Sequence, residues 1–95
     1  MAQRTFLITY GYAPEMAERR TPHRPAHLAA AQQAHAEGRL LFAAATTDPI
    51  DGAVLVMRAE NEAQVHEWIA MDPYVKAGLV RSISVREIAV AVGGR

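Results

Sequence analysis

Two apolar runs separated by a short turn constrain the fold of this chain more than any other feature. Residues 39–47 read RLLFAAATT, residues 53–58 read AVLVMR, and the intervening DPIDG supplies turn chemistry. The pattern predicts a β-hairpin. Because both strands are apolar on nearly every residue rather than on alternate ones, both faces of their sheet need to be buried.

The remaining sequence predicts two further strands and two helices. Residues 5–12 read TFLITYGY, a β-branched and aromatic run typical of a strand. Residues 26–37 are Ala-rich and precede Gly38, a natural helix C-cap. The expected elements in chain order are a strand over 5–12, a helical turn within 15–21, a helix over 26–37, the hairpin, a helix capped by Asn61 and ending at Ala70, a loop over 71–78, and a strand over 79–91 with an extension that the sequence does not place.

The order β-α-β-β-α-β predicts an α+β fold of the ferredoxin-like kind, with an antiparallel sheet and both helices on one face. A length of 95 residues predicts one domain over residues 1–95, of which residues 90–95 are expected to be a tail. Two helices cover only one sheet face, so we expect a second copy to cover the other. The expected assembly is a homodimeric α+β barrel, and the sequence leaves open whether dimers build larger rings.

Composition narrows the possible partners and compartments. The ten basic residues balance ten acidic ones, and only Arg19, Arg20 and Arg24 cluster, so no nucleic-acid partner is expected. The absence of cysteine excludes disulfides and thiolate chemistry. The first ten residues lack a signal-peptide pattern, and no segment approaches the ~20 apolar residues of a membrane helix. We therefore expect a soluble cytoplasmic protein with no membrane partner.

The chain also lacks the usual marks of a cofactor or metal site. It has no glycine-rich phosphate loop and no nucleophile elbow, so no organic cofactor is expected. His23 and His27 are four residues apart and His35 follows, but no nearby Cys or carboxylate completes a ligand set. A metal site is therefore not expected.

The most distinctive segment is MDPYVKAGL at residues 71–79, directly after an amphipathic helix. It occurs together with RPAHL at residues 24–28, GRLL at residues 38–41 and Asp-Gly at residues 51–52. In this combination the chain resembles the YciI family, from the first strand to the start of the C-terminal extension. One departure follows Gly38, where Ala-Ala-Ala-Thr replaces the family's common Ala-Gly-Pro type of turn, which bears on the size of any pocket there.

The resemblance implies a dimeric α+β barrel with a His and Asp pair in a pocket, here His27 and Asp72, and Arg24 matches a family position near that pocket. A carboxylate bonded to one imidazole nitrogen fixes the tautomer and leaves the other nitrogen to exchange a proton with substrate, which contributes roughly 10²- to 10⁴-fold in rate. Tyr10 and Tyr74 are candidates for binding a substrate oxygen. The ordinary alternatives are a structural helix histidine, an Asp-Pro turn and core tyrosines.

Three functions fit this sequence. The first is a small cofactor-free enzyme that transfers a proton on a small ring or enol substrate, because family members include a dehydrochlorinase acting on a chlorinated hydroxyhydroquinone. Lyase or isomerase chemistry is then expected. The second is a non-catalytic dimer that binds a small molecule or regulates a partner. The third, a cofactor-independent monooxygenase, rests on analogy of fold alone.

Overall fold

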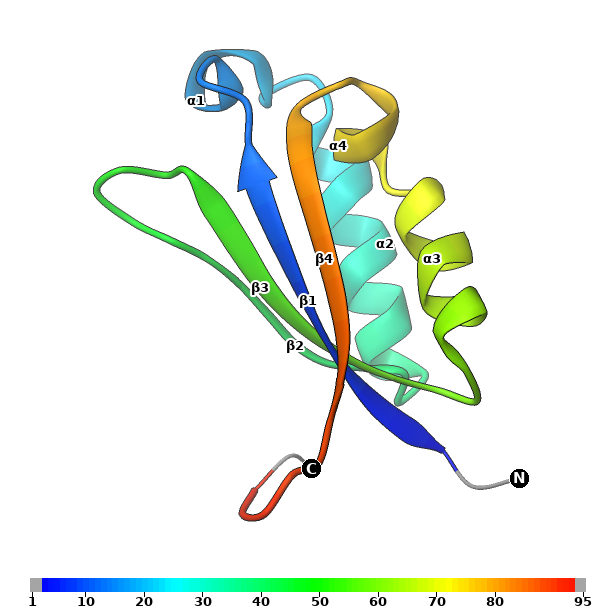
Figure 1. The fold of residues 1–95 in the computed structure, drawn as a ribbon. Coiled ribbons are helices and arrows are strands. Elements are labelled where there is room, and N and C mark those ends of the chain that lie inside the picture. The colour runs from blue at the N-terminus through cyan, green and yellow to red at the C-terminus, as the bar shows by residue number, and fades with distance from the viewer. Residues whose placement is uncertain (1–2, 94–95) are drawn as a thin grey trace.

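The computed structural model describes residues 3–93 and places eight helices and strands in that part of the chain (Figure 1). They are β1 (Arg4–Tyr12), α1 (Met16–Arg19), α2 (Arg24–Ala36), β2 (Leu40–Ala45), β3 (Gly52–Ala59), α3 (Glu62–Ala70), α4 (Pro73–Lys76) and β4 (Val80–Ile88). The four strands form one sheet in the order β2-β3-β1-β4.

Every pair of neighbouring strands in the sheet is antiparallel. The strand β3 lies between β1 and β2, and β1 lies between β3 and β4. The connection from β1 to β2 and the connection from β3 to β4 therefore each cross over one other strand of the sheet. Figure 1 shows α2 and α3 packed on the same face of the sheet. This is the split βαβ arrangement. The predicted ferredoxin-like α+β fold is confirmed.

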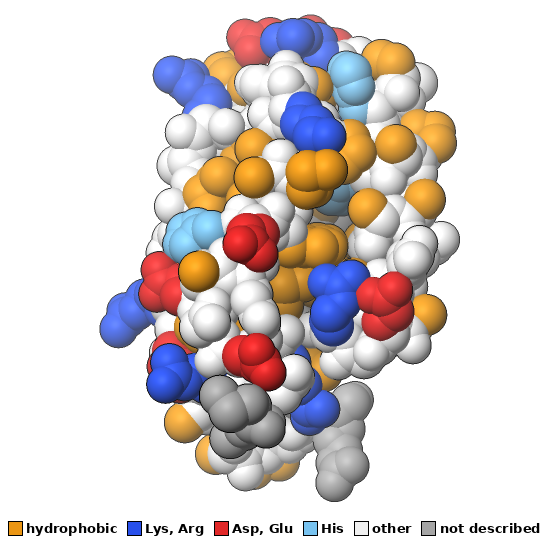
Figure 2. All heavy atoms as spheres, turned by 90° about the vertical axis from the view of Figure 1, so that its right-hand side faces the viewer, with side chains coloured by type: hydrophobic (Ala, Val, Ile, Leu, Met, Phe, Trp, Pro, Cys, Tyr) orange, Lys and Arg blue, Asp and Glu red, His pale blue; other side chains and the backbone are white. Residues whose placement is uncertain are grey.

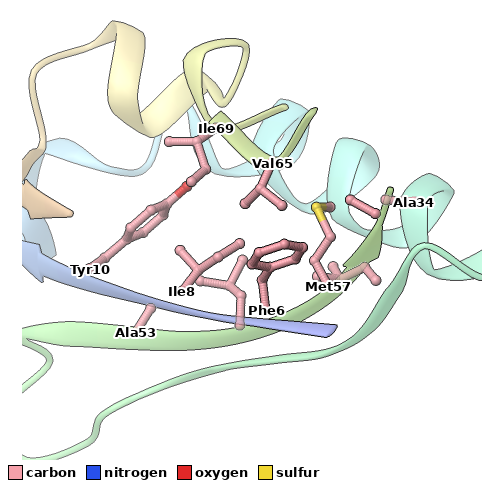
Figure 3. Packing of buried hydrophobic residues seen from close by; sticks show 11 residues of the cluster. Phe6, Ile8, Tyr10, Ala34, Ala53, Met57, Val65 and Ile69 are labelled. Carbon is pink, nitrogen blue, oxygen red and sulfur yellow. The ribbon is translucent and has the colours of Figure 1, made fainter. Parts of the chain in front are cut away.

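The core lies between the sheet and these two helices. Alternate residues of β1 and β3 point toward the helices because successive strand side chains face opposite ways. Phe6, Ile8 and Tyr10 of β1 are each at most 1% exposed, and they pack with Val65 and Ile69 of α3 (Figure 3). Full burial of one such apolar side chain stabilises the fold by about 1.5–3 kcal/mol.

The opposite face of the sheet is apolar over one half only. Val54 and Val56 of β3 pair with Thr9 and Leu7 of β1, and cross-strand partners share a face. On the far side of β1, the strand β4 pairs Ser84 with Thr9, so this half is polar. The expectation of two apolar faces therefore holds for the hairpin half and not for β4.

The helix-bearing side of the molecule carries charges of both signs. In Figure 2, basic and acidic side chains are spread among apolar ones over this side.

The longest helix of residues 3–93 is α2, with 13 residues. No helix in this described part of the chain is long and apolar enough to cross a membrane.

Two sequence-based boundaries differ from the structure. The expected loop over 71–78 contains the short helix α4, because the Asp72 side chain accepts a hydrogen bond from the Tyr74 N–H and Pro73 occupies the first turn. The last strand ends at Ile88 rather than at residue 91, and residues 89–93 belong to no helix or strand. Residues 94–95 of the expected tail lie outside the described residues.

Gly52, which the sequence assigned to the turn, is the first residue of β3 and sits opposite Gly11. A Cβ at this position would lie 2.7 Å from the backbone oxygen of Tyr10. We expect Gly52→Ala to lower the free energy of unfolding by about 1–3 kcal/mol, since the strand ladder must shift to make room. Urea denaturation measures the change. An unaltered midpoint would show that β1 and β3 do not approach this closely.

Candidate functional site

An imidazole and a carboxylate from distant parts of the sequence meet at one end of the sheet. His27 lies in the first turns of α2, and Asp72 is the N-cap residue of α4. The distance from His27 Nδ1 to Asp72 Oδ1 is 2.8 Å. The two side chains are 14% and 2% exposed, so the carboxylate is buried and the imidazole reaches the surface of a cavity.

Asp72 accepts three hydrogen bonds. The Tyr10 hydroxyl donates to Oδ2 at 2.9 Å, and the Tyr74 N–H donates to Oδ1 at 3.0 Å. His27 provides the third partner. An ionised carboxylate has no proton to donate, so the proton of this bond belongs to His27 Nδ1. The neutral imidazole then has Nε2 as its free acceptor.

Aromatic rings hold the imidazole in place. His27 stacks on Tyr74 with ring centroids 3.8 Å apart and an angle of 11° between the planes. Tyr12 meets Tyr74 edge to face at 6.2 Å, and Tyr10 lies 6.4 Å from Tyr12. Tyr10 and Tyr12 are two residues apart on β1, and their side chains therefore share a face. The tyrosines thus form an aromatic wall of mutually inclined rings, and one face of the Tyr74 ring is in contact with His27.

These side chains border a cavity of about 220 Å³ between α2 and the strands β1, β2 and β3. Two guanidinium groups stand at it, Arg20 at the end of α1 and Arg24 at the start of α2. Small apolar residues of the hairpin form another wall. The lining residues are Tyr10, Tyr12, Arg20, Arg24, His27, Leu28, Ala31, Ala43, Ala44, Ala45, Ala53, Leu55 and Tyr74.

All five residues singled out from the sequence come together here. His27, Arg24, Tyr10 and Tyr74 line the cavity, and Asp72 lies behind the imidazole. Their roles toward a substrate stay predictions. The Tyr10 hydroxyl is bonded to Asp72, so it is better placed to fix the carboxylate than to meet a ligand.

Sequence reasoning missed Arg20 and Tyr12 as site residues. Tyr12 could have been found, because it follows Tyr10 by two positions in the same strand. Arg20 belonged to the only local cluster of arginines, but its position depends on the path of the chain between β1 and α2.

In residues 3–93 no three His, Cys, Asp or Glu side chains come together to hold a metal ion.

Burial raises the pKa of every tyrosine in the chain. For Tyr10 burial is the main cause, and the neighbouring Asp72 charge adds to it. Burial raises the pKa of Tyr12 to about 12, with Tyr74 and Asp72 contributing and Arg20 opposing. Burial also raises the pKa of Tyr74, against the opposing charges of Arg20 and Arg24. All three rings are therefore neutral at physiological pH.

These pKa shifts predict a delayed tyrosine titration. In urea the three tyrosines should be half-ionised near pH ~10, whereas in the folded protein fewer than half should be ionised at that pH. Because the folded pKa of Tyr12 is raised, its contribution to stability is complete below pH ~10 and is lost as the pH rises through about 12. Absorbance at 295 nm measures both curves. A tyrosine that ionises below pH ~10 in the folded state would contradict the described burial.

Solved structures share this fold. The 5-chloro-2-hydroxyhydroquinone dehydrochlorinase TftG from Burkholderia phenoliruptrix, solved in complex with 2,5-dihydroxybenzoquinone, superposes with a TM-score of 0.79 at 26% identity, over 90% of this chain and 93% of that one. A protein described as a putative antibiotic biosynthesis monooxygenase from Bacteroides thetaiotaomicron gives a TM-score of 0.62 at 15% identity, over 98% and 93% of the two chains. The second likeness shows the fold alone.

Sequence comparison identifies the family. The YciI protein of Escherichia coli is 37% identical over 78 residues, which cover 73% of this chain and 80% of that protein. An uncharacterized protein of Haemophilus influenzae is 33% identical over 82 residues, covering 77% and 84%. The family model for the YCII-related domain matches residues 5–89. The chain therefore belongs to the YCII-related domain family, as the motifs around His27 and Asp72 had indicated.

Proposed function

We propose that this protein is a small cofactor-free enzyme in which His27, oriented by Asp72, transfers a proton on a small ring or enol substrate. The observation that carries the proposal is the 2.8 Å contact between His27 Nδ1 and Asp72 Oδ1 at the wall of a cavity. The buried carboxylate fixes the imidazole tautomer. Nε2 is then the atom that takes a proton from the substrate and returns it.

The cavity dimensions support a single-ring substrate. A volume of about 220 Å³ is below the ~300–1,000 Å³ of pockets for drug-sized ligands. Tyr12 and Tyr74, which meet edge to face, offer aromatic contacts to a flat ligand, and Arg24 is placed to stabilise negative charge on a substrate oxygen. Reactions that pass through an enolate or phenolate develop such a charge.

Elimination of HCl from a chlorinated hydroxyhydroquinone is a reaction of this class. Two hydroxyl protons leave oxygen, one moves to the ring carbon that bears chlorine, and the other departs with chloride as HCl. The ring becomes a quinone, and no oxidant is required because the C–Cl electron pair leaves with chloride. His27 would accept the hydroxyl proton and deliver it to carbon. The dehydrochlorinase activity of the structural neighbour TftG supports this choice.

A non-catalytic binding module is the competing reading of the same core. A closed or purely apolar interior, with His27 and Asp72 out of hydrogen-bond reach, would favour it. The cavity instead has two guanidinium groups and an imidazole on its wall. A monooxygenase rests on a 15% identical neighbour and therefore on fold alone.

Loss of the carboxylate should remove most of the proposed activity. Asp72→Asn takes away the negative charge that keeps the proton on His27 Nδ1, and His27→Gln removes the base, so each should reduce kcat by roughly 10²- to 10⁴-fold. Chloride release from 5-chloro-2-hydroxyhydroquinone measures the change. His66→Gln is the matched control, because His66 pairs with Glu62 on the exposed face of α3.

The outcomes separate the two readings. Equal chloride release by the wild type and the two site variants would refute the mechanism. Binding of 2,5-dihydroxybenzoquinone by a wild type that releases no chloride would favour the non-catalytic module.

We also propose that a second copy of the chain covers the helix-free face of the sheet. Its hairpin half presents the partly exposed Leu7 and Val54, and Phe42 on the edge strand β2 is 51% exposed. In a 95-residue domain the additional buried area adds to a small core. A twofold pairing would place the same apolar half of each copy against the other.

The pairing predicts the mass in solution. Light scattering at micromolar concentration should give twice the 10.4 kDa chain mass for the wild type and the single-chain mass for Val54→Asp, because a carboxylate in an apolar interface is costly to desolvate. Ala63→Asp, on the exposed surface of α3, should remain dimeric. Circular dichroism confirms that each variant is folded. A wild type that stays monomeric would refute the proposed pairing.

A further inference from the structure

Two arginines that line the cavity, Arg20 and Arg24, have their backbone positions fixed by hydrogen bonds. Arg20 is the C-cap residue of α1 and Arg24 opens α2, and the Arg24 N–H donates to the Arg20 carbonyl at 2.8 Å. The His23 N–H donates to the same carbonyl at 2.9 Å. The connection between the two helices is therefore a continuous hydrogen-bonded turn, which holds the backbone of both arginines beside the cavity that His27 also lines.

Among the described residues 3–93, no carboxylate pairs with these arginines. Elsewhere Arg39 pairs with Glu37, and Arg4 lies 4.0 Å from Glu87. Within residues 3–93, neither Arg20 nor Arg24 has a carboxylate oxygen within salt-bridge distance. Asp72 is the acidic residue behind the cavity, and its oxygens already accept hydrogen bonds from Tyr10, Tyr74 and His27. The cavity wall thus carries two positive charges without a fixed negative partner.

The charge of these arginines acts on the aromatic wall. Arg20 opposes the upward pKa shift of Tyr12, and both Arg20 and Arg24 oppose that of Tyr74. A positive group that favours a negative charge on the tyrosines of this wall also favours a negative charge on a ligand bound beside them. Guanidinium groups bind ionised oxygens through short, charge-assisted hydrogen bonds.

We propose that the cavity binds its ring ligand as an anion, either the hydroxyquinone that the proposed elimination forms or a related acidic ring with ionised oxygens, and that Arg20 is a second specificity residue beside Arg24. This inference rests on the proposed function for the identity of the site. A hydroxyl conjugated through a C=C bond to a quinone carbonyl is a vinylogous carboxylic acid, and it is ionised at neutral pH. Such a ring is flat, fits a cavity of about 220 Å³ and places its charge at its edge.

Binding of 2,5-dihydroxybenzoquinone by calorimetry tests the role of Arg20. Arg20→Gln should weaken binding about tenfold, equivalent to about 1.4 kcal/mol, and Arg20→Lys should weaken it less because the charge remains. Arg19→Gln is the matched control, because this exposed neighbour on α1 does not line the cavity. It should change the dissociation constant by less than about twofold, since exposed charges are screened by solvent.

Two further measurements, with a neutral ring and with added salt, isolate the contribution of the ligand's negative charge to binding. The wild type and Arg20→Gln should bind 2,5-dimethoxybenzoquinone equally weakly, because methylation removes the ionisable hydroxyls. Raising sodium chloride from 50 to about 500 mM should weaken binding of the anion to the wild type more than to Arg20→Gln. Thermal unfolding of each variant confirms that the fold is retained.

Three results would overturn the inference. They are equal affinities in Arg20→Gln and Arg19→Gln, binding of the neutral ring as tight as that of the anion, and no binding of the anion by the wild type. The first two can occur while His27 and Asp72 variants still lose chloride release, in which case the proposed reaction stands without anion recognition by Arg20. If Arg20→Gln weakens anion binding but no chloride is released, anion recognition stands and the proposed reaction fails.

Discussion

The buried carboxylate of Asp72 is the interaction on which both the fold and the site depend. It joins β1, α2 and α4 through Tyr10, His27 and the Tyr74 N–H, and the side-chain partners are 62 and 45 residues away in sequence. A buried charge without partners would be strongly destabilising, whereas three hydrogen bonds offset that cost. The same bonds that make the carboxylate tolerable also orient the imidazole. Stability and function of the site are therefore inseparable at this residue.

The fold could be predicted because its signals are local and consistent with one another. The β-branched run of β1, the Asn61 cap and the glycine after α2 each indicate an element or its end, and their order leaves few topologies. The helix α4 was missed because four residues carry no periodicity. Its only signal is the Asp-Pro pair, which is equally typical of a turn. The polar half of the open face depended on the register of β4, which the sequence does not specify.

The candidate site also contains residues that the sequence predicts and residues that it does not. His27 and Asp72 could be named because their motifs resemble a family, and the physical reading of their residue types agrees with that resemblance. Arg20 could not be assigned, because it reaches the cavity only through the turn that links α1 to α2. The position of such a residue follows from tertiary structure. A short charged segment between prolines does not reveal it.

The hairpin links the cavity to the face proposed for pairing. On β2, Ala43 and Ala45 pair with Leu55 and Ala53 on the helix side, while Ala44 pairs with Val54 on the open side. One layer of backbone therefore separates the cavity from the open face of the sheet. A second copy packed against Val54 would restrain the same strands that form the alanine wall. Because the alanine side chains are small, the volume of the cavity depends on the position of the strand backbone. Pairing would therefore fix that volume.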